Sequence, residues 1–203
     1  MNKKKQQILT TGKDLFWKYG IKRVTVEEIC NRSGVSKMTF YKHFSNKYDL
    51  AMDIMDSIYD ENINRYREIM SSDREYKDKV ADLYKIKLDA TNDMSHEFLN
   101  DYINSGETEL ISYLNGKIEK IMGIIINDFI IAQEKGEIRK DIKPEFINFF
   151  LDHMVKMSGY PELIKLYSNA QEMILELLNF FFYGILPRSE IINLNKQKFK
   201  NDV

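Results

Sequence analysis

The sequence has few residues that break helices, and it has too few cysteines to form a disulfide within the chain. Its 203 residues include three prolines, nine glycines, one tryptophan and one cysteine. The single Cys30 excludes an internal disulfide, and its apolar neighbours favour a buried thiol over a redox sensor. Because breaks are few and Leu, Ile, Lys, Glu and Met recur at helical spacing, the sequence predicts an all-α fold.

Long hydrophobic runs are also missing. The strongest apolar stretch, residues 121–132, is interrupted by Gly123, Asn127 and Asp128. It is shorter than the roughly 20 residues that span a bilayer. The first residues are basic and then polar, without the apolar core of a signal peptide. The sequence therefore predicts a soluble, cytoplasmic protein with no membrane partner.

The chain has no excess of either charge, with 30 basic residues against 31 acidic ones. The two charges are nevertheless sorted along the chain. Residues 1–50 hold 11 Lys and Arg and four acids, a net charge of +7, and the remainder holds 19 and 27, a net charge of −8. A basic end on an acidic body is what a protein needs to hold polyanionic DNA with one end only.

Helix-start signals lie in the segment 24–44, which reads VTVEEICNRSGVSKMTFYKHF. Thr25 and Glu28 have the spacing of a capping box, in which each side chain accepts a hydrogen bond from the other residue's amide. Val24 and Ile29 stand where a hydrophobic staple fixes the entering chain. A helix therefore begins at this point.

A tight turn follows within the same segment. Ser33 and Gly34 stop the first helix, because glycine takes the left-handed conformation just past a helix end. Ser36 then caps a second helix, and so short a link makes the two helices cross steeply, as in a helix-turn-helix. An ordinary helical hairpin is the alternative on the turn pattern alone, and the basic charge of this end favours DNA.

Further helices follow from periodicity and breaks. The first should cover about residues 4–19, and Phe40 and Phe44 should complete a small core with it. Asn46 should cap a long helix that Ser71–Asp73 ends, and Pro144 lies at a first helical turn. The remaining predicted helices cover residues 76–93, 94–104, 108–135, 143–158 and 170–183.

The last two of these helices are unusually apolar. Their Phe, Ile, Leu and Met residues occur on too many sides for one buried face. We therefore predict a second face covered by a partner chain. A deep internal core is the alternative interpretation.

The residues described so far resemble the N-terminal domain of the TetR family of transcriptional regulators. The resemblance covers about residues 8–50, and two positions depart from it: Gly12 replaces a usual alanine, and Met38 replaces a frequent Gly, Ala or Pro. The residues that carry it are Ile8-Leu9, Leu15-Phe16, Tyr19-Gly20, Thr25–Ile29, Gly34–Lys37, Thr39–Tyr41, His43-Phe44, Asn46-Lys47 and Asp49-Leu50.

The resemblance implies a three-helix helix-turn-helix DNA-binding domain in residues 1–48. A helical effector-binding and dimerisation domain would follow in residues 49–187, with a flexible polar tail in 188–203. It also implies a homodimer on double-stranded DNA, with a palindromic operator, no cofactor, and a small-molecule effector that releases a repressor from the DNA.

In such a domain the second helix of the motif enters the major groove. Lys37 can then donate to guanine, Met38 can touch a thymine methyl group, and Thr39 can bond several bases. Lys42 would reach a base or a phosphate. The resemblance implies that Thr25, Tyr41, His43 and Lys47 contact DNA phosphates. Thr25 could instead be solely a helix cap, and Tyr41 could be partly in the core. The complete predicted DNA-binding set is Thr25, Ser36, Lys37, Met38, Thr39, Tyr41, Lys42, His43 and Lys47.

An effector pocket is predicted in the acidic part of the chain. Aromatic and methionine side chains suit an apolar or aromatic ligand, and a cationic ligand is compatible with them, but the sequence does not identify the effector. The same residues could instead be plain core. The predicted lining consists of Phe98, Tyr102, Phe150, His153, Met154 and Met157.

Catalysis has no support in the sequence. His43, His96 and His153 are scattered, without metal-ligand spacing or a glycine-rich phosphate loop. The sequence therefore predicts a non-enzymatic, ligand-responsive regulator without a metal site. Two alternatives stay open: a ligand-independent helical DNA-binding or adaptor protein, and a small helical enzyme.

Overall fold

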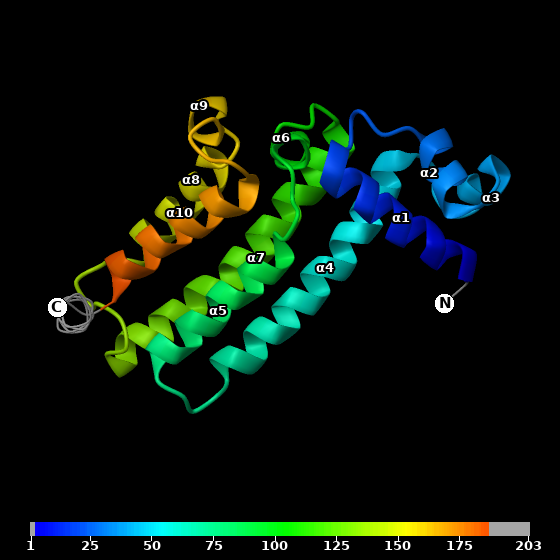
Figure 1. Ribbon diagram of the computed structural model, residues 1–203. Helices are drawn as coiled ribbons and strands as arrows, with labels where there is room; N and C mark the ends of the chain where they lie inside the picture. The colour runs from blue at the N-terminus through cyan, green and yellow to red at the C-terminus, as the bar shows by residue number, and fades with distance from the viewer. Residues whose placement is uncertain (1–2, 187–203) are drawn as a thin grey trace, which may run out of the picture.

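The computed structural model describes residues 3–186, and these residues form ten helices and no strand (Figure 1). The all-α prediction is confirmed. Three helices make a small unit at one end, called here the N-terminal head: α1 (Lys3–Tyr19), α2 (Val26–Ser33) and α3 (Lys37–Tyr41). The long α4 (Lys47–Met70) leaves this head and runs the length of the molecule.

Residues 76–185 form an elongated helical body beside α4 (Figure 1). The helices α8 and α10 lie on the side of the body away from the head. No helix in residues 3–186 is both long enough and apolar enough to cross a bilayer. The body consists of α5 (Tyr76–Ala90), α6 (His96–Ile103), α7 (Thr108–Lys135), α8 (Pro144–Met157), α9 (Pro161–Ile164) and α10 (Ala170–Ile185).

The predicted caps start the helices of the head. The Thr25 hydroxyl accepts the Glu28 amide at 3.1 Å, and the Ser36 hydroxyl accepts the Thr39 amide at 3.1 Å. The other half of the predicted capping box, from the Thr25 amide to the Glu28 carboxylate, does not form. The Glu28 carboxylate instead pairs with Arg32 at 3.1 Å. Gly34 adopts the left-handed conformation (φ 68°) that ends α2.

The start of α4 is fixed from two directions. The Asn46 side chain accepts the amides of Tyr48 and Asp49, at 2.8 and 2.9 Å. The Asp49 carboxylate reaches back to the Ser45 amide at 2.8 Å. The predicted cap is confirmed, and these bonds hold the first turn of α4 directly behind the helix-turn-helix.

Gly12 has a packing role that its sequence position did not reveal. A Cβ atom at Gly12 would come within 2.8 Å of the Leu50 methyl Cδ2, and Leu50 is fully buried. The missing side chain therefore lets α1 approach α4 closely. This close approach offsets the lower helix propensity of glycine.

One hydrophobic core joins the head to part of the body. It contains Ile8, Phe16 and Phe40 of the head, and also Phe98 of α6 and Leu114 of α7. Trp17 and Phe98 bring their ring centroids to 4.1 Å. The head is therefore packed on α6 and α7 as well as being continuous with α4.

Several helix ends differ from the sequence expectations. Helix α5 ends at Ala90, α6 begins at His96, and α10 continues to Ile185. The short α9 lies between the two last predicted helices. Pro161 stands in its first turn, where the missing N–H of proline costs no helical hydrogen bond. The predicted tail, residues 188–203, lies outside the described residues.

Candidate DNA-binding surface and effector cavity

The helix α3 presents polar side chains on the outside of the head. Met38 is 83% exposed and Tyr41 is 56% exposed, whereas Phe40 between them is fully buried. Lys37 and Lys42 are exposed, and Thr39 is half-buried. The alternation follows from the helical period, which turns Phe40 into the core and its neighbours outward.

The structure brings most of the predicted DNA-binding residues to this surface. Thr25 and Ser36 are exposed, and both are occupied as helix caps. His43 is half-buried beside the Phe44 ring. Thr25, Ser36 and the α3 residues Lys37, Met38 and Tyr41 are therefore accessible to solvent on the head. Whether they contact DNA stays a prediction.

Lys37 has a partner within the head. Its Nζ lies 3.0 Å from the Glu27 carboxylate of α2, and this hydrogen bond raises the pKa of the lysine. Both side chains are more than half exposed, so the pair is weak. Breaking the ion pair with Glu27 therefore costs little free energy, so the Lys37 ammonium group is available for another partner.

Lys47 was expected to contact a DNA phosphate, but its ammonium group has hydrogen-bond partners within the protein. Its Nζ donates to the backbone carbonyls of Lys22 and Val24, at 2.6 and 3.0 Å. Burial lowers the pKa of Lys47, while the charges of Asp101 and Glu107 act in the opposite direction. The ammonium group therefore holds the α1–α2 loop against the first turn of α4.

The same loop is tied to α6. The Asp101 carboxylate accepts the Lys22 amide at 2.8 Å, and the Lys22 Nζ donates to the Asn104 carbonyl at 3.0 Å. We call Lys22, Lys47, Asp101 and Asn104 the α6 junction. Sequence reasoning missed three of these four residues, because their partners lie about 80 positions away in the chain.

Gly20 is needed for this contact. Its backbone is left-handed (φ 81°), and an added Cβ would come 2.6 Å from the Asp101 carboxylate. The loop after α1 can therefore approach α6 only with glycine at this position.

A second polar chain links α4 to the body. The Tyr113 hydroxyl of α7 donates to the Asp56 carboxylate at 2.8 Å, and Lys117 forms an ion pair with the same carboxylate. Burial alone would raise the pKa of Asp56, but Lys117 and Tyr113 hold it below its usual value. Close by, the hydroxyls of Tyr59 and Tyr102 are hydrogen-bonded to each other.

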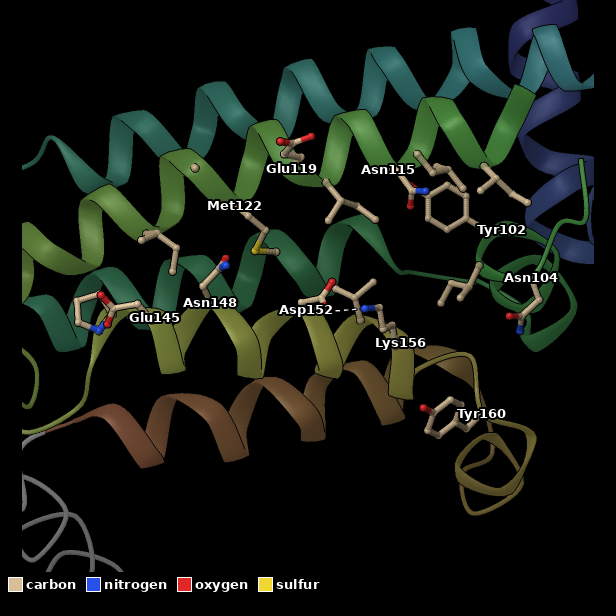
Figure 2. A pocket seen from close by; sticks show the side chains of 18 of the residues that line it. Tyr102, Asn104, Asn115, Glu119, Met122, Glu145, Asn148, Asp152, Lys156 and Tyr160 are labelled. Carbon is tan, nitrogen blue, oxygen red and sulfur yellow. Dashed lines mark hydrogen bonds and ion pairs between the residues drawn. The ribbon is translucent and has the colours of Figure 1, made fainter. Parts of the chain in front are cut away.

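A cavity of about 1030 Å³ opens between α7 and α8, with α6 at one end (Figure 2). Its floor is a row of apolar side chains spaced four residues apart along α7. Tyr102 and Asn104 of α6 line the end nearest the head. The α7 row consists of Leu114, Ile118, Met122, Ile126 and Ile130.

Only Tyr102 of the six predicted lining residues lies on this cavity. Phe98 is in the core beneath Trp17, and Met154 is in the core of the body, where Phe150 packs against Phe181. His153 is exposed with its ring against Phe149 at 4.0 Å between centroids, and Met157 is half-buried outside the lining. The predicted residues lie on or directly beside α6 and α8, but five of the six face away from this cavity, and the lining contributed by α7 was not predicted.

Helix α8 has three distinct faces. Ile147, Leu151 and Met154 are buried in the core, and Glu145, Asn148 and Asp152 line the cavity. Phe146 and Phe149 point elsewhere, and they are 58% and 59% exposed. Phe180 and Tyr183 of α10 are 73% and 49% exposed. The surplus of apolar residues in these helices therefore divides between a core and an uncovered aromatic surface.

The histidines are separate from one another in the fold. Within residues 3–186, no group of three or more His, Cys, Asp or Glu side chains is arranged to hold a metal ion. Cys30 is buried, and burial raises the pKa of its thiol.

The comparisons with known proteins agree with this description of the head. The model of the bacterial regulatory proteins of the tetR family matches residues 8–54. The HTH-type transcriptional regulator YerO of Bacillus subtilis (strain 168) is 35% identical over 69 residues, which are 34% of this chain and 24% of YerO. The HTH-type transcriptional repressor KstR2 of Rhodococcus jostii (strain RHA1) is 23% identical over 152 residues, or 73% of this chain and 74% of KstR2.

Solved structures extend the likeness to the whole fold. The fatty acid degradation regulator FadR from Bacillus halodurans has a TM-score of 0.70 at 14% identity, over 89% of this chain and 95% of that one. FadR from Bacillus subtilis in complex with stearoyl-CoA has a TM-score of 0.66 at 16% identity, over 87% and 96%. At such identities the likeness shows the fold alone.

Residues 8–54 therefore match the N-terminal domain of the tetR family of bacterial regulatory proteins. The family match covers the head and the start of α4, where the caps, the Gly34 turn and the exposed α3 lie. The match to YerO spans about a quarter of that protein's length.

Proposed function

We propose that the protein is a cytoplasmic, homodimeric transcriptional repressor that leaves a palindromic operator when a small molecule occupies the α7–α8 cavity. The observation that carries the DNA-binding part is the exposed α3 on a head with a net charge of +7 in residues 1–50. Lys37, Met38 and Thr39 would meet base edges. Thr25, Tyr41, Lys42 and His43 would hold phosphates.

The exposed aromatic surface supports the dimer. Phe146 and Phe149 of α8 and Phe180 and Tyr183 of α10 are all about half exposed or more. Burying such side chains against a second copy is favourable by about 25 cal/mol per Å². A two-fold dimer presents two copies of α3, which fits two half-sites of a palindrome.

The α6 junction supports regulation. Asn104 lines the cavity and its carbonyl accepts the Lys22 ammonium, and the Lys22 carbonyl accepts the Lys47 ammonium of α4. A ligand that moves α6 would therefore move both the α1–α2 loop and the first turn of α4. A coupling of about 1–3 kcal/mol between the two sites is enough to change DNA affinity many-fold.

Selection from a random duplex library tests the proposal, with the wild-type protein and no assumption about the operator. We expect enrichment of an inverted repeat whose half-sites are about one helical turn apart or a multiple of it. Enrichment of no common sequence, with equal binding to all duplexes, would favour the alternative of a ligand-independent DNA-binding protein.

Effector release is measured next on the selected duplex. The solved FadR complex with stearoyl-CoA makes an anionic acyl ligand one alternative to compare. A compound that binds the protein and lowers operator affinity at least several-fold would support the effector role. A compound that fills the cavity and leaves operator affinity unchanged would count against it.

A further inference from the structure

The cavity has a chemical character that narrows the effector class. We propose, resting on the effector role above, that it takes a cationic amphiphile: one positive charge on an elongated apolar body. The α7 row from Leu114 to Ile130 defines the length of the apolar floor. At 1.5 Å per residue this row extends about 24 Å, which suits a chain or a flat elongated ring system better than a compact ligand.

The charges around this floor are mostly negative. Glu119 of α7 and Glu145 and Asp152 of α8 line the cavity, against the single cation Lys156 (Figure 2). The Lys156 ammonium is already paired with the Asp152 carboxylate at 2.6 Å. Among the described residues, no ion pair is formed by Glu119 or Glu145.

An anionic headgroup therefore finds no free cation in this lining. It would have to displace Asp152 from Lys156, in a lining whose other charged side chains are the carboxylates Glu119 and Glu145. A cationic headgroup meets the opposite situation, because carboxylates line the cavity at separate places along it, Glu119 on α7 and Glu145 near the start of α8 (Figure 2). Asn115 and Asn148 add polar groups without charge.

The apolar floor and the carboxylates have different roles in this proposal. The floor binds the body of the ligand whatever its charge, so it supplies most of the affinity. The carboxylates select the sign of the headgroup. Because they are exposed, each should change affinity only modestly, by about 2- to 5-fold.

Dodecyltrimethylammonium and dodecanoate make a matched pair of probes, since both carry a twelve-carbon chain and differ in charge. Calorimetric titration of the wild-type protein, below the concentrations at which the probes form micelles, should show saturable binding of the cation. The anion should bind at least 5-fold more weakly. Equal or tighter binding of dodecanoate would overturn the proposal, as would saturable binding of neither probe.

Substitutions assign the effect to the cavity. The variant Glu119→Gln/Glu145→Gln should lose about 2- to 5-fold in affinity for the cation, because the two carboxylates lie at different places along the cavity and a single charge contacts one of them. The variant Glu109→Gln/Glu134→Gln makes the same charge change on exposed positions of α7 outside the lining, and it should keep wild-type affinity. Equal losses in both variants would show a general charge effect and overturn the site.

The titrations with the two probes contain no DNA, so their outcome does not depend on whether the protein regulates transcription. A protein that selects an operator but binds neither probe would keep the proposed function and lose this inference. A protein that binds the cation through Glu119 and Glu145 but selects no DNA sequence would keep the ligand site and lose the regulator.

Discussion

Lys47 joins the α1–α2 loop to α4, since its ammonium donates to the carbonyls of Lys22 and Val24. Replacing it with methionine leaves both carbonyls without this donor. We expect Lys47→Met to lower the free energy of unfolding by about 0.5–1.5 kcal/mol, partly offset because burial of the charge is relieved. Urea unfolding followed by circular dichroism measures the change.

Lys42 supplies the matched control for that experiment. It directly follows α3, five residues before Lys47, is exposed and also carries one positive charge. Lys42→Met should change the free energy of unfolding by less than about 0.5 kcal/mol. Equal destabilisation by both substitutions would contradict a structural role specific to Lys47.

At the scale of the elements, α6 is the helix that contacts both the head and the cavity. Asp101 holds the Lys22 amide, while its neighbour Tyr102 lines the cavity. We expect Asp101→Ala to increase hydrogen exchange at residues 20–25 at least several-fold, because the loop loses its anchor on α6. Mass spectrometry of deuterated peptides measures this directly.

The control is Asp89→Ala, which removes an exposed carboxylate paired with Arg65 between α4 and α5. It should leave exchange at residues 20–25 unchanged. Unchanged exchange in Asp101→Ala as well would contradict the role of the Asp101 carboxylate as the anchor of this loop on α6.

Local signals in the sequence were enough to place the helices of the head. Thr25, Ser36 and Asn46 cap the helices that follow them, and Gly34 ends α2 as expected. Each of these signals acts within about four residues, so the sequence alone reveals it. The exposure of α3 followed in the same way from the helical period.

The cavity and the α6 junction were not predictable in this way. Lys22 and Asp101 are 79 positions apart, and the cavity arises where one face of α7 meets one face of α8. The sequence showed that apolar residues of α8 occur on too many sides for one buried face. It could not show which of these sides faces the core, the cavity or the solvent. Phe150 and Met154 were therefore assigned to the cavity when they lie in the core.

At the scale of the whole molecule, the aromatic surface of α8 and α10 bears on the oligomeric state. We expect wild-type protein to sediment as a dimer at micromolar concentration, and Phe149→Lys or Phe180→Lys to give folded monomers, because an ammonium group would be buried between the copies. Analytical ultracentrifugation with circular dichroism measures assembly and folding together.

A substitution at Phe181 is the control that distinguishes loss of the dimer interface from unfolding of the protomer. It is 5% exposed and packs against Phe129 and Phe150, so Phe181→Lys should destabilise each protomer rather than release a folded monomer. A wild-type monomer at micromolar concentration would contradict the proposed dimer.

If α3 reads base sequence, removal of the Lys37 side chain should weaken binding to the operator more than binding to other DNA. Lys37→Ala leaves the buried Phe40 and the Ser36 cap of α3 in place, because the Lys37 side chain is exposed and pairs only weakly with Glu27. The measurement is an equilibrium titration of wild-type and Lys37→Ala protein on the selected operator and on a scrambled duplex, at several salt concentrations.

We expect Lys37→Ala to lose about 1–3 kcal/mol of binding free energy on the operator. On the scrambled duplex it should lose much less, and the salt dependence there should stay close to that of the wild type. Equal losses on both duplexes, or none on either, would contradict sequence reading by α3.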